Sequence, residues 1–262
     1  MSQDNVPSIV EALQECFETG EYADMTITCE DKIWRVHKVV VCSQVPFFAK
    51  AVTGRFKEAV DSCIDLVDDD PSAVEVMLRW LYYGTFQVEK SKPPSMSTIL
   101  FLARSYTIAD KYLLADLRTT VGQKLRAALM HRDWDVEDLL ALIEESFAGA
   151  DEFSSVAPEL LRTWVISAAH ANYTFCFHSS PSHMRFREVT SSRPDFLSGV
   201  RDLVEAERSR NNRKKQFLYA GAFGNGSGLA AHVPSRPGDI SDPFSNLPGH
   251  PPKHRSGPFW QY

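Results

Sequence analysis

The chain contains 262 residues, of which 44% are hydrophobic, and carries a formal net charge of −6 at pH 7. This composition is ordinary for a globular protein, and an acidic chain offers no overall positive field for phosphates, so direct nucleic-acid binding is not expected. No apolar run approaches the roughly 20 residues that cross a bilayer, and residues 1–10 lack the basic cluster of a signal peptide, so neither membrane insertion nor export is expected.

The first predicted elements are a helix and a β-hairpin. Ser8 and Glu11 have the spacing of a capping box, and Gly20 can adopt the left-handed conformation that ends a helix, so a helix is expected over residues 8–20. Between Met25 and Val36, apolar and polar residues alternate on both sides of a charged turn. This alternation predicts two antiparallel strands.

Short helices and one more strand are expected next. The apolar run Lys38–Phe48 contains Pro46, which can end one helix and begin another, so two short buried helices are predicted there. A third strand is expected around residues 64–67, and a helix between Pro71 and Gly84 follows. Three strands among short helices indicate an α+β fold rather than a doubly wound parallel sheet.

Only helices are predicted beyond the loop at residues 86–95. Two of them cover about residues 96–108 and 114–125. Three more follow residue 132, and their expected starts are an aspartate and two prolines: Asp133 or Asp135, Pro158 and Pro194. Residues 172–192 are irregular, and within them Tyr173–Phe177 fits either a helix end or a short strand.

Changes in residue pattern divide the chain into four parts. They are an N-terminal helix (1–20), an α+β domain (21–130), a helical extension (131–207) and a final segment (208–262). The final segment begins with a basic run, and from about residue 221 it is rich in glycine and proline and has no apolar stripe. Too little apolar area is then available to offset the entropy of ordering, so a disordered tail is expected.

Several segments resemble the BTB/POZ domain in order and in spacing. They are Asp24-Met25-Thr26-Ile27, Trp34-Arg35-Val36-His37-Lys38, Pro46-Phe47-Phe48, Phe56-Lys57-Glu58, Trp80-Leu81-Tyr82-Tyr83-Gly84-Thr85 and Ala109-Asp110-Lys111-Tyr112. The resemblance covers about residues 20–130 and implies a small mixed sheet packed on a cluster of α-helical hairpins. The helical extension is similar to the one that often follows this domain, and the whole chain resembles the BTB-only proteins of filamentous fungi.

The resemblance implies a protein-interaction adaptor that is not an enzyme and that dimerises with itself or with another BTB protein. In such a dimer, the helix at residues 8–18 packs on the partner subunit, and apolar side chains of Lys38–Val45 are buried between the copies. The family signature, which includes candidate interface residues, is Asp24, His37, Lys38 and Val41.

Two of these signature residues have more than one interpretation. Asp24 fits a contact with a basic group or backbone donor at the dimer interface, and it fits a plain surface cap equally well. His37 fits a hydrogen-bonded residue at a helix entry better than a catalytic base or a metal ligand.

A second partner is implied by the triplet Phe56, Lys57 and Glu58. In BTB adaptors for cullin-type ubiquitin ligases, a hydrophobic residue, any residue and a glutamate precede the third strand, and this triplet lies at the matching position. The resemblance implies that Phe56 inserts into a groove of the cullin while Glu58 pairs with a charge. The alternative is that Phe56 folds back onto the core. The client protein that such an adaptor recruits is not identified by the sequence.

The basic run consists of Arg208, Arg210, Arg213, Lys214 and Lys215. It fits a nuclear-import signal or an anion-binding patch, and it also fits a solvated helix end that the helix macrodipole favours. A nuclear transcriptional scaffold is therefore the alternative to the adaptor function.

No catalytic residue, cofactor site or metal site is predicted. Five widely spaced cysteines favour reduced thiols and therefore a cytoplasmic or nuclear protein. A cysteine hydrolase that uses Cys42 or Cys176 is the least favoured function, because the pKa of Cys42 should rise in its apolar helix.

Two side-chain clusters could suggest metal ligands. The acidic cluster Asp65, Asp68, Asp69 and Asp70 precedes Pro71, so we interpret it as favourable charge at a helix N-terminus. The second cluster, Cys176, His178 and His183, lacks a fourth zinc ligand at motif spacing.

Overall fold

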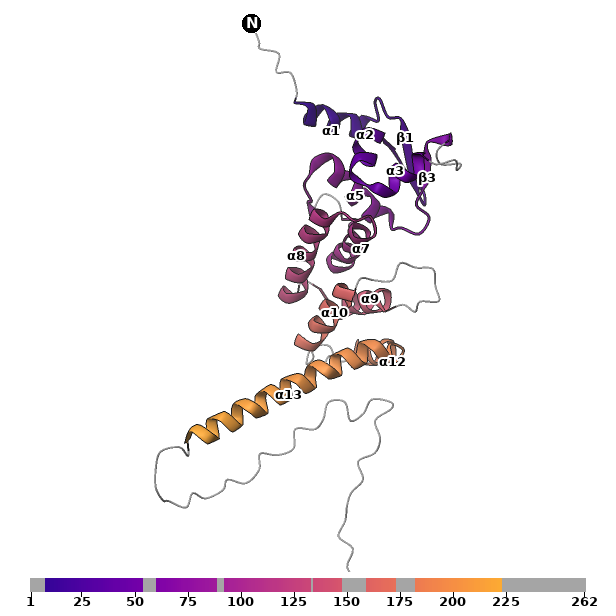
Figure 1. Ribbon diagram of the computed structural model, residues 1–262. Helices are drawn as coiled ribbons and strands as arrows, with labels where there is room; N and C mark the ends of the chain where they lie inside the picture. Colours follow the sequence, from indigo (N-terminus) through magenta and orange to yellow (C-terminus); the bar gives the residue numbers. More distant parts are fainter. Residues whose placement is uncertain are drawn as a thin grey trace, which may run out of the picture.

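The computed structural model describes residues 8–53, 60–88, 92–132, 134–147, 159–172 and 182–222, with side chains up to residue 216 except those of residues 182 and 183. A three-stranded mixed sheet lies among helices in the first half, and helices follow it (Figure 1). This arrangement confirms the predicted α+β class. The predicted disordered tail beyond residue 222 lies outside the described residues.

The fold opens with the predicted helix and hairpin. α1 (Ile9–Thr19) has the Ser8 and Glu11 capping box at its start, and Gly20 ends it with a φ of 72°. β1 (Met25–Cys29) is the central strand of the sheet. It pairs antiparallel with β2 (Lys32–Val36) and parallel with β3 (Cys63–Asp65), which is shorter than the predicted strand.

Helices form the remainder of this N-terminal unit. α2 (Lys38–Gln44) and α3 (Pro46–Thr53) meet at the predicted proline. α5 (Pro71–Tyr83) begins after Asp70, which accepts a hydrogen bond from the Ala73 N–H, and it ends at Gly84 in the left-handed conformation. The hairpin of α7 (Thr98–Lys111) and α8 (Ala115–His131) completes the unit.

The extension contains four described helices, α9 (Val136–Ser146), α10 (Glu159–Ala171), α12 (Ser182–Ser191) and α13 (Pro194–Ala222). Asp135 forms a capping box with Asp138 and is therefore the N-cap of α9. α12 lies at the end of the irregular stretch 172–192, whereas residues 173–177, for which a helix end or a strand was expected, lie outside the described residues. The boundary predicted at residue 207 falls inside α13, because this helix continues through the basic run.

The N-terminal unit and the extension share one hydrophobic core, which runs from Met25 to Val200. At the junction, the ring of Trp164 on α10 packs edge-on against Tyr106 on α7, with centroids 5.1 Å apart. Gly122 on α8 makes room for both rings, since a Cβ atom there would lie 3.1 Å from each of them. The extension is therefore packed onto the unit rather than tethered to it. None of the described helices is long and apolar enough to span a bilayer.

Candidate protein-interaction surfaces

A buried histidine fixes the segment between α1 and β1 onto the start of α2. The Nε2 atom of His37 lies 2.7 Å from the Glu21 carbonyl oxygen, and its Nδ1 atom lies 2.8 Å from the Tyr82 hydroxyl. That hydroxyl also accepts a hydrogen bond from the His37 N–H at 2.8 Å. Because a carbonyl only accepts, Nε2 carries the hydrogen and Tyr82 donates to Nδ1. Both ring nitrogens are therefore occupied in a structural network, and burial raises the pKa of Tyr82 to about 12.

Asp24 and Lys38 also make contacts within their own chain. The Asp24 carboxylate accepts a hydrogen bond of 2.7 Å from the backbone N–H of Lys38, in the first turn of α2. The Lys38 ammonium donates to the Ser62 hydroxyl at 2.7 Å. Asp24 thus accepts a hydrogen bond from a backbone donor of its own chain at the start of α2, while the side chain of His37 makes no cap hydrogen bond.

Most of the apolar side chains of the Lys38–Val45 segment lie inside their own chain. Val41 and Val45 are wholly buried and Val40 is nearly so. Val41 is therefore a core residue and offers no side-chain surface to a partner, contrary to an interface role. Among the valines of this segment, only Val39 is exposed, at 73%.

Four exposed apolar side chains nevertheless lie on α1, on α2 and in the turn between α1 and β1. Tyr22, in the turn after α1, is 84% exposed and has a left-handed φ of 59°. Ile9 and Val10, at the start of α1, are 78% and 52% exposed. We call Ile9, Val10, Tyr22 and Val39 the α1–α2 surface. Large apolar side chains that are both exposed and rigidly held are typical of protein-binding sites.

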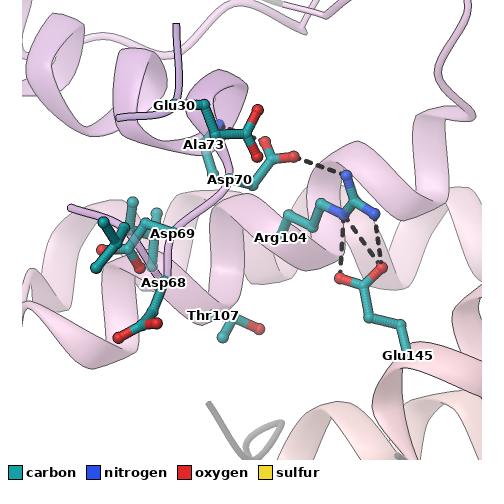
Figure 2. Close-up of a pocket in the computed structure, with 10 residues that line it drawn as sticks. Glu30, Asp68, Asp69, Asp70, Ala73, Arg104, Thr107 and Glu145 are labelled. Carbon is teal, nitrogen blue, oxygen red and sulfur yellow. Dashed lines mark hydrogen bonds and ion pairs between the residues drawn. The ribbon is translucent and has the colours of Figure 1, made fainter. Parts of the chain in front are cut away.

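A second feature is an acidic groove between the N-terminal unit and α9 (Figure 2). Arg104 of α7 lies between two carboxylates in this groove, as Figure 2 shows. Its guanidinium donates to both oxygens of Glu145 on α9, at 2.9–3.1 Å, and to Asp70 at 2.6 Å. Arg104 therefore ties the N-terminus of α5 to the extension. Nothing local in the sequence indicated this contact, because Arg104 and Glu145 are 41 residues apart.

The electrostatic state of Asp70 follows from these bonds. Burial opposes ionisation of its carboxyl group, but hydrogen bonds from Ser72 and Ala73, together with the charge of Arg104, lower its pKa below the ordinary value. Asp70 is the N-cap of α5, which agrees with the interpretation of the acidic cluster as helix-capping charge.

The other acids of the cluster have separate roles. Asp69 pairs with Lys111 at 2.8 Å and accepts a hydrogen bond from the Tyr112 hydroxyl at 2.6 Å. Asp65 accepts a hydrogen bond from Thr28 across the sheet. Across the described ranges, no group of histidines, cysteines and acids is arranged to hold a metal ion. Arg104, Asp69, Asp70 and Glu145 of the groove are thus engaged in structural ion pairs.

The remaining candidate residues divide into described and undescribed ones. Burial raises the pKa of the Cys42 thiol, as its apolar helix predicted. The basic run lies on α13 with all its side chains exposed. The residues outside the described ranges include the cullin-type triplet and part of the second cluster: Phe56, Lys57, Glu58, Cys176 and His178.

Comparisons with known proteins match the N-terminal unit. The family model for the BTB/POZ domain matches residues 13–127. The human and orangutan (Pongo abelii) proteins named Kelch repeat and BTB domain-containing protein 4 are each 28% identical over 102 residues, which are 39% of this chain and 17% and 18% of those proteins. A BTB/POZ domain-containing protein of Arabidopsis thaliana is 30% identical over 106 residues, which are 39% of this chain and 13% of that protein.

The matched region thus spans less than a fifth of the length of these curated relatives. The family-model match coincides with the sheet and the helical hairpins, from α1 to near the end of α8. This chain therefore contains a BTB/POZ domain, which occupies residues 13–127.

Proposed function

We propose that this chain is a protein-interaction adaptor that forms dimers through its α1–α2 surface and recruits other proteins through the rest of the molecule. The BTB/POZ domain and the relatives that combine it with Kelch repeats support an interaction role. The single observation that carries the dimer proposal is the exposed pair of Tyr22 and Val39.

The backbone around this pair is held in place although both side chains are largely exposed within the described part of the chain. Tyr22 adopts a left-handed backbone that costs a bulky residue of the order of 1 kcal/mol or more. It adjoins Glu21, which is bonded to His37, and Val39 follows Lys38, which is bonded to Asp24. An apolar pair held in this way is preorganised for contact with another chain.

The apolar stripe of α1 gives a second argument for a partner. Leu13 and Phe17 pack partly on the core, and the Phe17 ring stacks on Tyr82 with centroids 4.4 Å apart. Ile9 continues the same stripe one turn earlier but is 78% exposed. The apolar stripe of α1 therefore extends beyond the part that packs on the core. In a two-fold dimer, a second copy would cover Ile9.

The dimer is tested with the double variant Tyr22→Asp and Val39→Asp. Two carboxylates in an apolar interface should weaken association by about 100-fold or more, because each would be buried without a partner. The matched control is Leu113→Asp with Met130→Asp. These residues are 77% and 74% exposed, and Leu113 also has a left-handed φ of 61°.

Light scattering after size-exclusion chromatography gives the masses. A dimer in the control variant and a monomer in the Tyr22 variant would support the proposal. A monomeric unmodified chain, or equal association of both variants, would refute it.

Recruitment of a cullin-type ligase through Phe56, Lys57 and Glu58 stays a proposal that rests on the position of the triplet. Phe56→Ala with Glu58→Ala should abolish capture of a purified cullin, whereas Lys57→Ala, at the position where any residue is accepted, should not. Unchanged capture by the first variant would reject the assignment. The alternative of a nuclear scaffold predicts that neutralising Arg213, Lys214 and Lys215 moves a tagged protein from nucleus to cytoplasm.

A further inference from the structure

Four residues of the basic run on α13, Arg210, Arg213, Lys214 and Lys215, have no structural explanation among the residues that the structure describes. Attraction to the helix macrodipole does not explain these charges, because α13 continues to Ala222 and its last turn holds no basic residue. The dipole effect is confined to about the last turn, and Lys215 lies well before it. Within the described residues, no ion pair involves Arg210, Arg213, Lys214 or Lys215.

Repulsion between the basic side chains also destabilises the helix on which they lie. Arg210 is three residues from Arg213 and four residues from Lys214, so like charges face each other along one side. All side chains from residue 205 to 216 are exposed, and Figure 1 shows α13 running past α10 and away from the other helices. Arg210, Arg213 and Lys214 keep their mutual repulsion without an ion-pair partner among the described residues, and such a set of charges has the character of a binding surface for an anion.

Charge is also strongly segregated along the chain. Residues 208–262 contain eight of the 28 basic residues and only two of the 34 acidic ones. The net charge of −6 is therefore the sum of a strongly acidic part, residues 1–207, and a basic part, residues 208–262. The expectation that this chain does not bind nucleic acid was drawn from that sum, and it does not apply to α13 by itself.

The distribution of the charges around α13 indicates the shape of the anion. At 100° per residue, Arg210, Arg213 and Lys214 lie within about 100° of one another, and Lys215 lies on nearly the opposite side, beside Arg208. A flat membrane surface would contact only one of these sides. The major groove of B-DNA is about 12 Å wide and is bordered by phosphates on both sides, so it admits a helix that is charged on opposite faces.

We infer that the second half of α13 binds the phosphate backbone of double-stranded DNA without sequence preference. This inference is independent of the proposed dimer, although a dimer would present two such helices. Duplex RNA is a poorer fit, because its major groove is too deep and narrow for a helix. Asn211, Asn212 and Gln216, which lie among the basic residues, add amide donors for phosphate oxygens.

The experiment measures fluorescence anisotropy of a labelled DNA duplex with the full chain, at salt concentrations from about 0.05 to 0.2 M. The variant Arg213→Gln, Lys214→Gln and Lys215→Gln removes three charges from α13. The control Lys50→Gln, Lys124→Gln and Arg201→Gln removes three charges from exposed side chains outside the second half of α13. Both variants therefore have the same net charge.

The expected result is a loss of affinity of at least about tenfold in the α13 variant only, with a log–log salt slope that is about 2.7 smaller. Equal losses in both variants, or no binding by the unmodified chain, would overturn the inference. Vesicles containing phosphatidylserine form a further arm, because the apolar residues 217–219 follow the run. Tighter binding to these vesicles than to the duplex would overturn it as well.

Discussion

Charged side chains differ between two regions of the molecule. They are paired at the junction of the BTB/POZ domain with the extension, and they lack ion-pair partners among the described residues on the second half of α13. At the junction, Arg104 is shared by Asp70 and Glu145, and the neighbouring aromatic rings are packed. On α13, four basic side chains are exposed and without an ion-pair partner in the described chain. The comparison separates residues that hold the fold together from residues that are free to bind something else.

The largest effect is expected where the extension packs on the domain. Trp164→Ala removes a ring that fills the space beside Tyr106 and Gly122, and it should lower the free energy of unfolding by about 3 kcal/mol. Leu160→Ala on the same helix, where the side chain is 58% exposed, should cost less than about 0.5 kcal/mol. Urea unfolding measures both. Similar losses would mean that the extension is not packed as described.

A somewhat smaller effect is expected from Arg104→Met. This change leaves the mostly buried carboxylate of Asp70 without its cation, and we expect a loss of about 2 kcal/mol. Arg104→Lys keeps the charge but cannot bridge both carboxylates, so about half of that loss should remain. Thermal unfolding of the two variants checks the order. A lysine variant as stable as the unmodified chain would contradict the bridging role.

The same ion pair makes stability depend on pH. The pKa of Asp70 is lower in the folded chain than in the unfolded one, so its stabilisation is complete above the unfolded pKa of about 4 and is lost as the pH falls through the lower folded value. Asp70→Asn keeps an N-cap oxygen but cannot titrate. Its unfolding free energy should therefore decline less steeply below about pH 4 than that of the unmodified chain. Equally steep declines would contradict the assignment.

The smallest effect is expected on α13, and it has the opposite sign. Lys214→Ala removes repulsion with Arg210 and introduces a better helix former, so stability should stay the same or rise by about 0.3 kcal/mol. Circular dichroism of the two chains in low salt compares their helix content. A marked loss of helix would show that Lys214 has a structural partner, and the contrast between the two regions would then fail.

The sequence predicted the elements whose signals are local. Ser8, Asp70 and Gly84 begin or end helices through hydrogen bonds and backbone conformations that depend on the residue itself and its near neighbours. The alternation from Met25 to Val36 likewise predicted the hairpin, because one face of these strands is buried. Capping and alternation patterns were therefore sufficient to predict these helix ends and the hairpin.

The sites depended on contacts that no local pattern contains. Tyr82 lies in a predicted helix, and only the fold brings its hydroxyl to His37, 45 residues away. The apolar run around Val41 suggested an interface, but apolar residues in a helix do not reveal which of them the same chain covers. The extent of α13 was also missed, since its side chains from residue 205 to 216 are exposed and leave no apolar stripe to mark the helix there.

The central claim is that the domain associates with a second copy through Tyr22 and Val39. Sedimentation velocity over a range of concentrations tests it most directly, with the unmodified chain and the Tyr22→Asp variant side by side. We expect a species of about twice 29.5 kDa for the unmodified chain and a species near 29.5 kDa for the variant. An unmodified chain that sediments as a monomer at every concentration would contradict it.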